Sequence, residues 1–238
     1  MSLLSLPGTS GNPILSVSKT EVELFPPESA MTKTAFIGDV HGYAPALKMA
    51  LKWCRTENVE AIVGLGDFVD GYDADEECLD LIREHFSVCV RGNHDEDHAM
   101  ELLPESAQWL GELPQSIEFG GWLVTHSSPR VGRQDEYIRS SVDAWNCFED
   151  CEFNRCIVGH THQPMLYRFS DARKFDSEAL DATGNGQVLE PGYRYFLVNP
   201  SLAYNRTGQQ NPGFSVFDAD TQKLRIVYLD LPQIERKF

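Results

Sequence analysis

The sequence contains no long apolar run and no excess of basic residues. Spanning a bilayer takes a stretch of about 18 apolar residues, and no run in this chain approaches that length. Lys and Arg together number 20 against 36 Asp and Glu, so the formal net charge is -16. Because proteins that bind nucleic-acid backbones normally carry a basic surface, we expect neither a membrane partner nor a nucleic-acid polymer.

The sequence also lacks a cysteine framework and a secretory leader. Its six cysteines show no paired C-x2-C spacing, which disfavours structural zinc, and Cys147, Cys151 and Cys156 are better explained as small residues packed inward. Residues 1–32 have no basic start before a hydrophobic run and are rich in Ser, Pro, Gly and Thr. We therefore expect free thiols, a cytoplasmic location and a flexible N-terminal extension over residues 1–32.

Residues 33–238 are expected to form a single domain of mixed α/β class. Three short apolar runs predict buried strands, each ending in a polar turn, and helical patterns at 47–53 and 76–85 follow the first two. The runs and their turns are Thr34–Gly38 with Asp39–Gly42, Ala61–Leu65 with Gly66–Gly71, and Phe86–Val90 with Arg91–Asp95. This order predicts a parallel βαβαβ sheet with the polar turns at one edge.

The second half predicts two more strands that end on histidines and then a series of antiparallel strands. Gly121–Thr125 precedes His126, and Arg155–Val158 precedes the turn Gly159–His162. Helices are expected at 101–113, broken at Pro104, and at 137–148, with alternating strands at 165–169, 195–198, 214–217 and 224–229. Residues 170–192 are polar and contain glycines, which predicts an exposed insertion.

The strand ends supply a set of side chains that suits divalent metal ions. The set is Asp39, His41, Asp67, Asn93, His126, His160 and His162. Mixed carboxylate, imidazole and amide ligands favour manganese, iron or zinc over calcium or magnesium. Since a carboxylate has two oxygens and Asp67 is central in the strand order, we expect it to bridge two ions roughly 3.5–4 Å apart. Two such ions would make one positive pocket in an acidic chain, which predicts a phosphate ester as substrate.

Residues beside these ligands have predicted catalytic and binding roles. His94 is predicted to protonate the leaving-group oxygen as general acid, with Asp95 or another nearby carboxylate holding its imidazole in the required tautomer. Arg130 and Arg206 are predicted to contact non-transferred phosphate oxygens through their guanidinium groups.

Each residue taken alone has an ordinary structural explanation. Gly92 to Asp95 could form a simple turn, His126 could be a capped or core histidine, and Asp39 with His41 could be a helix N-cap pair. Chance rarely places five of the seven histidines in the chain directly after buried strands. The set as a whole therefore favours a metal centre.

These motifs resemble those of the calcineurin-like metallophosphoesterase superfamily. Its D-x-H-G, G-D-x-x-D, G-N-H-D/E, lone H and G-H-x-H motifs appear here as Asp39–Gly42, Gly66–Asp70, Gly92–Asp95, His126 and Gly159–His162. The chain is most similar to the bacterial branch described as diadenosine tetraphosphatase-like or phosphoprotein phosphatase-like, whose H-G-S-P-R and V-N-P-G-S segments resemble His126–Arg130 and Val198–Ser201. Ser127 replaces a glycine and a glycine is missing after Pro200, in loops that often approach the substrate in relatives.

The resemblance implies a four-layer αββα sandwich of two mixed sheets flanked by helices, with a dinuclear site between the sheet edges. It implies that Asp67 bridges two metals and that Asp70 has no ligand role. The other implied ligands are Asp39, His41 and His162 at one metal and Asn93, His126 and His160 at the other.

The implied activity is hydrolysis of a phosphomonoester or phosphodiester by in-line attack of a hydroxide that bridges the two metals, with His94 as general acid. A diester or another small-molecule phosphate ester is favoured as substrate, since the negative net charge repels polymeric anions, while dinucleoside polyphosphates and phosphoproteins stay open as substrates. The alternative is a scaffold or binding protein that keeps the fold with weak catalysis. Such members usually lack one or more ligands, whereas this sequence fills every ligand position.

Overall fold

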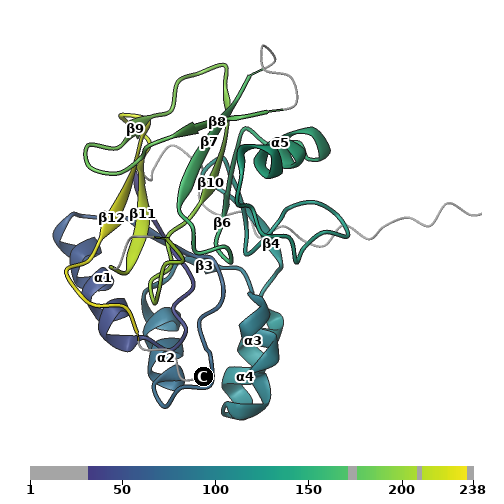
Figure 1. Cartoon of the computed structure of the whole chain (residues 1–238). Coiled ribbons are helices and arrows are strands. Elements are labelled where there is room, and N and C mark those ends of the chain that lie inside the picture. Colours follow the sequence, from purple (N-terminus) through teal and green to yellow (C-terminus); the bar gives the residue numbers. More distant parts are fainter. Residues whose placement is uncertain (1–31, 171–175, 208–210, 235–238) are drawn as a thin grey trace, which may run out of the picture.

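The computed structural model describes residues 32–170, 176–207 and 211–234, which form helices and two β-sheets (Figure 1). The strands are β1 (Lys33–Ile37), β2 (Ala61–Gly64), β3 (Val88–Cys89), β4 (Ser116–Phe119), β5 (Trp122–Thr125), β6 (Arg155–Val158), β7 (Met165–Phe169), β8 (Glu178–Leu180), β9 (Gln187–Val188), β10 (Arg194–Val198), β11 (Gly213–Asp218) and β12 (Lys223–Tyr228). The helices are α1 (Ala44–Thr56), α2 (Asp75–His85), α3 (Asn93–Asp97), α4 (Pro104–Glu112) and α5 (Ser141–Asp150), with a 3-10 helix η1 (Ala99–Glu101). Of the predicted extension, residues 1–31 lie outside the described ranges. Within those ranges, no helix has the length and apolar character needed to cross a membrane.

The first sheet has the strand order β3-β2-β1-β11-β12-β9. Strands β1, β2 and β3 are parallel, with Thr34 opposite Ala61 and Val63 opposite Val88, and α1 and α2 connect them. The predicted βαβαβ unit is confirmed. Because parallel strands point the same way, the turns that follow them meet at one edge of the sheet.

The second sheet has the strand order β4-β5-β6-β10-β7-β8. Strand β6 is parallel to β5 and β10, whereas β7 is antiparallel to β10. The sequence predicts β10 as antiparallel, and this is correct only on its β7 side. Strand β4 escapes prediction because half of it is polar. It pairs antiparallel with β5, and Gly120 and Gly121 form the turn between the two strands. Their positive φ values of 56° and 74° suit a tight hairpin turn.

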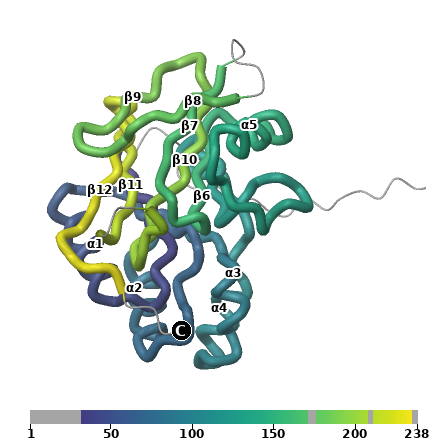
Figure 2. Tube along the Cα trace, in the orientation of Figure 1, coloured from purple at the N-terminus to yellow at the C-terminus, as the bar shows by residue number. Residues whose placement is uncertain are grey.

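The prediction that residues 170–192 form an exposed insertion is wrong for the later part of this segment. Strand β8 pairs with β7, and β9 pairs with β12. Figure 2 shows the chain passing from β8 at the edge of one sheet to β9 at the edge of the other. Ala182 and Leu189 are each 2% exposed and lie in the core between the sheets. These apolar residues are too widely spaced to show a strand period in the sequence, so only their pairing partners reveal the strands.

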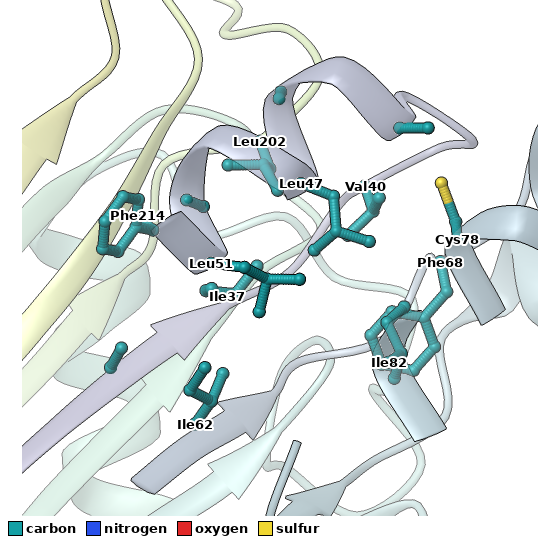
Figure 3. Close-up of a cluster of buried hydrophobic side chains, with 14 of the residues drawn as sticks. Ile37, Val40, Leu47, Leu51, Ile62, Phe68, Cys78, Ile82, Leu202 and Phe214 are labelled. Atoms are coloured by element: carbon teal, nitrogen blue, oxygen red, sulfur yellow. The ribbon is translucent and has the colours of Figure 1, made fainter. Parts of the chain in front are cut away.

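Helices α1 and α2 cover the outer face of the first sheet. A spacing of four residues places Leu47 and Leu51 on the same face of α1. With Ile82 from α2, they pack in one buried cluster with Ile37 of β1 and Ile62 of β2 (Figure 3). Burial of each such side chain stabilises the fold by about 1.5–3 kcal/mol.

The inner faces of the two sheets pack against each other, and α5 covers the outer face of the second sheet. Between the sheets, the Trp122 ring lies 5.3 Å from that of Phe36 and 5.4 Å from that of Phe217. On the far side, Phe148 of α5 lies 6.2 Å from Phe196 of β10. Helix, sheet, sheet and helix therefore form the four-layer αββα sandwich that the sequence predicts.

Helix α5 begins at Ser141, later than the predicted start at residue 137. The Ser140 hydroxyl accepts a hydrogen bond from the Asp143 backbone N–H at 3.2 Å and so caps the helix at this point. Cys147 of α5 and Cys156 of β6 are fully buried in the cluster that α5 covers. Cys151, the third of these predicted inward-packed cysteines, is only partly buried, so the prediction holds for two of the three.

Candidate metal centre

The seven predicted ligands converge where the strands of the two sheets end. The predicted ligands form two groups of atoms within 4.8 Å of one another, which are Asp39, His41, Asp67 and His162 in the first and Asp67, His126 and His160 in the second. A third such group joins His41 to Asp70 and His94, which are not predicted ligands. The Asn93 Oδ1 atom joins the second group, since it lies 3.1 Å from His126 Nε2 and 3.0 Å from His160 Nδ1. Asp67 is common to both groups, in the place expected of a bridging ligand.

Hydrogen bonds between the loops hold this arrangement together. The backbone N–H of Asp39 donates to the Gly66 carbonyl at 2.9 Å, and that of His41 donates to the Asp67 carbonyl at 3.0 Å. The His160 backbone N–H donates to Asp39 Oδ1 at 2.9 Å, which joins the loops after β1 and β6 across the two sheets. The ligand positions are therefore set by the backbone as well as by the side chains.

Hydrogen bonds orient His126 and His162 so that the Nε2 lone pair of each imidazole faces a carboxylate oxygen inside the site. His126 Nδ1 donates to the Leu65 carbonyl at 2.7 Å, and His162 Nδ1 donates to the Tyr204 carbonyl at 2.9 Å. In a neutral ring the Nε2 atom then carries a lone pair. His126 Nε2 lies 3.3 Å from Asp67 Oδ2, and His162 Nε2 lies 3.0 Å from Asp39 Oδ1. A carboxylate oxygen and an imidazole lone pair repel each other, so each pair requires a cation or a proton between them.

The charges in the site also indicate that a cation or a proton is required between these groups. Burial alone lowers the pKa of His126, but the Asp67 and Asp39 carboxylates, together with the hydrogen bonds to Asp67 and Leu65, outweigh burial and raise that pKa to about 10. Burial and the neighbouring His126 charge lower the pKa of His160 to about 4. The buried Asp39 Oδ2 and His160 Nε2 atoms have no hydrogen-bond partner among the described residues. This donor set, with unpartnered buried atoms and a shared carboxylate, fits divalent metal ions.

The backbone at the ligands is held in an uncommon conformation. Five of the seven predicted ligands have positive φ, with values of 51° at Asp39, 45° at His41, 52° at Asp67, 58° at His160 and 56° at His162. Residues other than glycine rarely occupy this left-handed region, and such strain is concentrated at functional sites.

Two glycines let the loops approach the carboxylates of Asp67 and Asp39 closely. A Cβ atom at Gly92 would lie 2.2 Å from Asp67 Oδ1, and one at Gly159 would lie 2.6 Å from Asp39 Oδ2. Both distances are far below van der Waals contact. Any larger residue at either position would displace a carboxylate of the site.

Comparison with known proteins identifies the family. A family model described as calcineurin-like phosphoesterase matches residues 32–164. The chain belongs to this family. Membership in it points to the hydrolysis of phosphate esters and to the use of divalent metals.

Three similar proteins show how far the similarity of this chain extends. An uncharacterised protein of Methanocaldococcus jannaschii is 26% identical over 82% of this chain and 86% of its own length. A serine/threonine-protein phosphatase 1 of Salmonella typhimurium is 36% identical, but over only 54% of this chain and 58% of its own length. The crystal structure of a metallophosphoesterase from Sphaerobacter thermophilus superposes with a TM-score of 0.71 at 25% identity, covering 84% of this chain and 89% of that one.

Of the two alternatives that the sequence leaves open for holding His94, Asp95 or another nearby carboxylate, the structure favours the second. Asp95 is 1% exposed, and its carboxylate accepts hydrogen bonds from the backbone N–H groups of Asp67 at 2.9 Å, Phe68 at 2.7 Å and Gly92 at 2.9 Å. Because it occupies the first turn of α3, its side chain turns back toward the helix N-terminus. Asp95 therefore holds the loop that carries Asp67.

The carboxylate that contacts His94 belongs to Asp70. His94 Nδ1 lies 2.5 Å from Asp70 Oδ1, and the His94 backbone N–H donates to Asp67 Oδ1 at 2.9 Å. The hydrogen bond to Asp70 outweighs burial and raises the pKa of His94. The G-D-x-x-D motif contains Asp70, so the sequence carries the signal although it assigns the residue no role. His98, whose ring stacks on that of His94 at 5.9 Å, lies in no motif.

The two predicted arginines differ in their surroundings. Arg130 Nε lies 2.6 Å from Asp150 Oδ2 and its Nη1 lies 2.8 Å from Glu136 Oε2. Carboxylates of the chain thus occupy the Arg130 guanidinium, and the predicted phosphate contact is not supported. The Arg206 backbone N–H donates to the His162 carbonyl at 2.7 Å, which places this residue beside a predicted ligand.

The segment after Pro200 forms part of the scaffold beneath the site. Ser201 is fully buried, and its hydroxyl donates to the Asp39 carbonyl at 3.0 Å. The same oxygen accepts the backbone N–H of Tyr204 at 3.0 Å. Since the Tyr204 carbonyl orients His162, Ser201 supports ligands in two loops at once.

Proposed function

We propose that this protein hydrolyses small phosphate esters with a pair of divalent metal ions. The observation that carries the proposal is the position of Asp67, whose carboxylate belongs to both ligand groups. Asp39, His41 and His162 would complete the first group, and Asn93, His126 and His160 the second. When bound, such ions supply Lewis acidity toward a phosphoryl group and lower the pKa of a bound water.

His94 serves as the general acid in this proposal. The hydrogen bond to Asp70 raises the pKa of His94, which favours the protonated imidazole, and His94 directly follows the proposed ligand Asn93 in the chain. Proton donation to the leaving-group oxygen makes the departing alcohol or phenol a better leaving group. Asp70 holds the ring so that Nε2 is directed away from the carboxylate, and Asp95 keeps the loop below it in place.

The proposed substrate is a phosphomonoester or phosphodiester of low molecular weight. The formal charge of -16 repels large polyanions, whereas the site gathers positive charge when metals are bound. Manganese, iron and zinc suit the donor set. We assign residues 33–238 to a single domain, because β1 near the start of this range pairs with β11 near its end. A scaffold function is disfavoured because all seven ligand positions are filled and converge.

A metal-supplemented assay tests the proposal. Protein loaded with manganese should hydrolyse p-nitrophenyl phosphate or bis(p-nitrophenyl) phosphate and should contain two ions per chain by elemental analysis. Asp67→Asn should lose activity by at least about 100-fold together with metal, since it removes the shared charge. Asp73→Asn, an exposed aspartate outside the site, is the matched control. Metal-loaded wild-type protein without hydrolysis of either ester, or an active Asp67→Asn variant, would contradict the proposal.

A further inference from the structure

Three side chains form a cationic surface beside the metal centre, which we name the arginine shelf: Tyr137, Arg139 and Arg206. The Tyr137 ring stacks on the His160 imidazole, with centroids 4.3 Å apart and planes 20° apart. The Arg139 guanidinium carbon lies 4.4 Å from the centre of the Tyr137 ring, and that of Arg206 lies 5.4 Å from it. One tyrosine therefore holds two cations next to a predicted metal ligand.

The shelf also borders the other group of ligands. The Arg206 backbone is fixed to the His162 carbonyl, and its side chain hydrogen-bonds with Tyr137 and Tyr204. The Tyr204 ring in turn lies 4.6 Å from that of His162 and 5.2 Å from that of His41. Arg206 is thus positioned by aromatic side chains that contact ligands of both groups.

The positive charges of the shelf have no ion-pair partner among the described residues. In the ranges that the structure describes, no carboxylate forms an ion pair with the guanidinium of Arg139 or Arg206. The nearby Arg130 is paired with two carboxylates and Arg133 with one. In a chain with 36 acidic and 20 basic residues, two neighbouring guanidinium groups without such a partner beside the site indicate an anion supplied from outside.

We propose that the arginine shelf binds a second phosphoryl group of the substrate. The inference rests on the proposed function, in which the metal centre holds the phosphoryl group that is cleaved. A single phosphate at that centre leaves the shelf unpaired, whereas a phosphoanhydride or a closely spaced bisphosphate supplies a second anion to it. Guanidinium groups suit this task because their planar N–H donors match phosphate oxygens in pairs. The substrate class is accordingly a small ester or anhydride with at least two phosphoryl groups.

Two phosphonates that resist hydrolysis provide a direct test. Methylphosphonate carries one phosphoryl-like group and methylenediphosphonate carries two. Their dissociation constants are measured by calorimetry on the full manganese-loaded chain at fixed free manganese. Arg139→Gln and Arg206→Gln should each weaken methylenediphosphonate binding by about tenfold, the loss typical of one charge-assisted hydrogen bond, and methylphosphonate binding by less than about twofold. Arg133→Gln, in the same loop but paired with Glu136, is the matched control and should change neither constant.

The outcomes separate this inference from the proposed function. Suppose that the wild-type protein hydrolyses aryl phosphates but that Arg139→Gln and Arg206→Gln keep the wild-type ratio of the two phosphonate dissociation constants. The shelf then does not bind a second phosphoryl group, and the proposed function stands. Equal weakening of both phosphonates would also overturn it, because the arginines would then serve the metal-bound group. If no ester is hydrolysed yet the variants selectively lose diphosphonate affinity, the proposed function fails while the anion site is retained.

Discussion

The Asp70 carboxylate lies at the centre of three imidazoles. Its Oδ1 atom is 2.5 Å from His94 Nδ1 and 3.5 Å from His98 Nε2, and its Oδ2 atom is 3.4 Å from His41 Nδ1. The buried Asp75 carboxylate holds the loop of Asp70 by accepting backbone N–H groups, including that of Gly71 at 2.8 Å. One acidic residue thus joins a predicted ligand to the proposed general acid.

Substitution of Asp70 should shift the pH dependence of activity. The hydrogen bond to Asp70 raises the pKa of His94, so the ring stays protonated to higher pH than a free histidine. Asp70→Asn removes the charge and lowers that pKa, so the alkaline limb of the kcat profile should move to lower pH by about one unit or more. The control is Asp73→Asn, which should leave the limb in place. An unchanged limb in Asp70→Asn would show that His94 does not limit activity at high pH.

Removal of His94 should affect poor leaving groups most. A general acid typically contributes about 10²–10⁴-fold, and its contribution grows as the leaving group becomes more basic. His94→Ala should therefore reduce kcat more for phenyl phosphate than for p-nitrophenyl phosphate. His85→Ala, which changes a half-buried histidine of α2, is the control, and both variants should keep wild-type metal content. Equal losses on the two esters would exclude a general-acid role.

Addition of one methyl group at Gly92 should disrupt the centre. The new Cβ would lie 2.2 Å from Asp67 Oδ1 and 2.3 Å from the Asp67 backbone nitrogen, so Gly92→Ala must displace the shared carboxylate. We expect reduced metal content and a loss of about 1–3 kcal/mol in the free energy of unfolding. Gly111→Ala in α4 meets no atom within 4 Å and should be neutral or stabilising by up to about 1 kcal/mol. Elemental analysis and urea unfolding measure both effects.

Metal removal should make stability depend on pH. In the metal-free protein the pKa of His126 is about 10, against 6.5 for an unperturbed histidine. Folded protein then holds a proton that unfolded protein releases, so the free energy of unfolding should fall as pH rises from about 6.5 to 10, by up to about 1.4 kcal/mol per unit.

The matching measurement is urea unfolding at pH 7 and pH 9, with chelator and with manganese. His126→Gln should flatten the dependence seen with chelator, because the titrating group is gone. Metal-loaded protein should unfold at higher urea concentration, since the ions bind only the folded state. A chelated wild-type protein equally stable at pH 7 and pH 9 would contradict the charge assignment at His126.

The sequence alone predicted most of the strands, the order of the motifs and the seven ligand candidates, but it missed β4, β8 and β9. Buried parallel strands appear in a sequence as short apolar runs. The polar residues that follow such strands must lie at one edge of the sheet. The pattern therefore predicts a candidate metal centre at this edge. It determined the αββα layers less directly, because resemblance to a family supplied them.

Tertiary structure alone decided which neighbour each polar side chain meets. Asp70 rather than Asp95 contacts His94, because α3 turns Asp95 back toward its own N-terminus while the loop after β2 brings Asp70 across. Arg130 meets Asp150 and Arg206 meets Tyr137, although the sequence predicts the same phosphate contact for both arginines. These partners lie up to tens of residues apart in the chain, and a side chain's partner depends on direction and distance in space, which local sequence patterns do not encode.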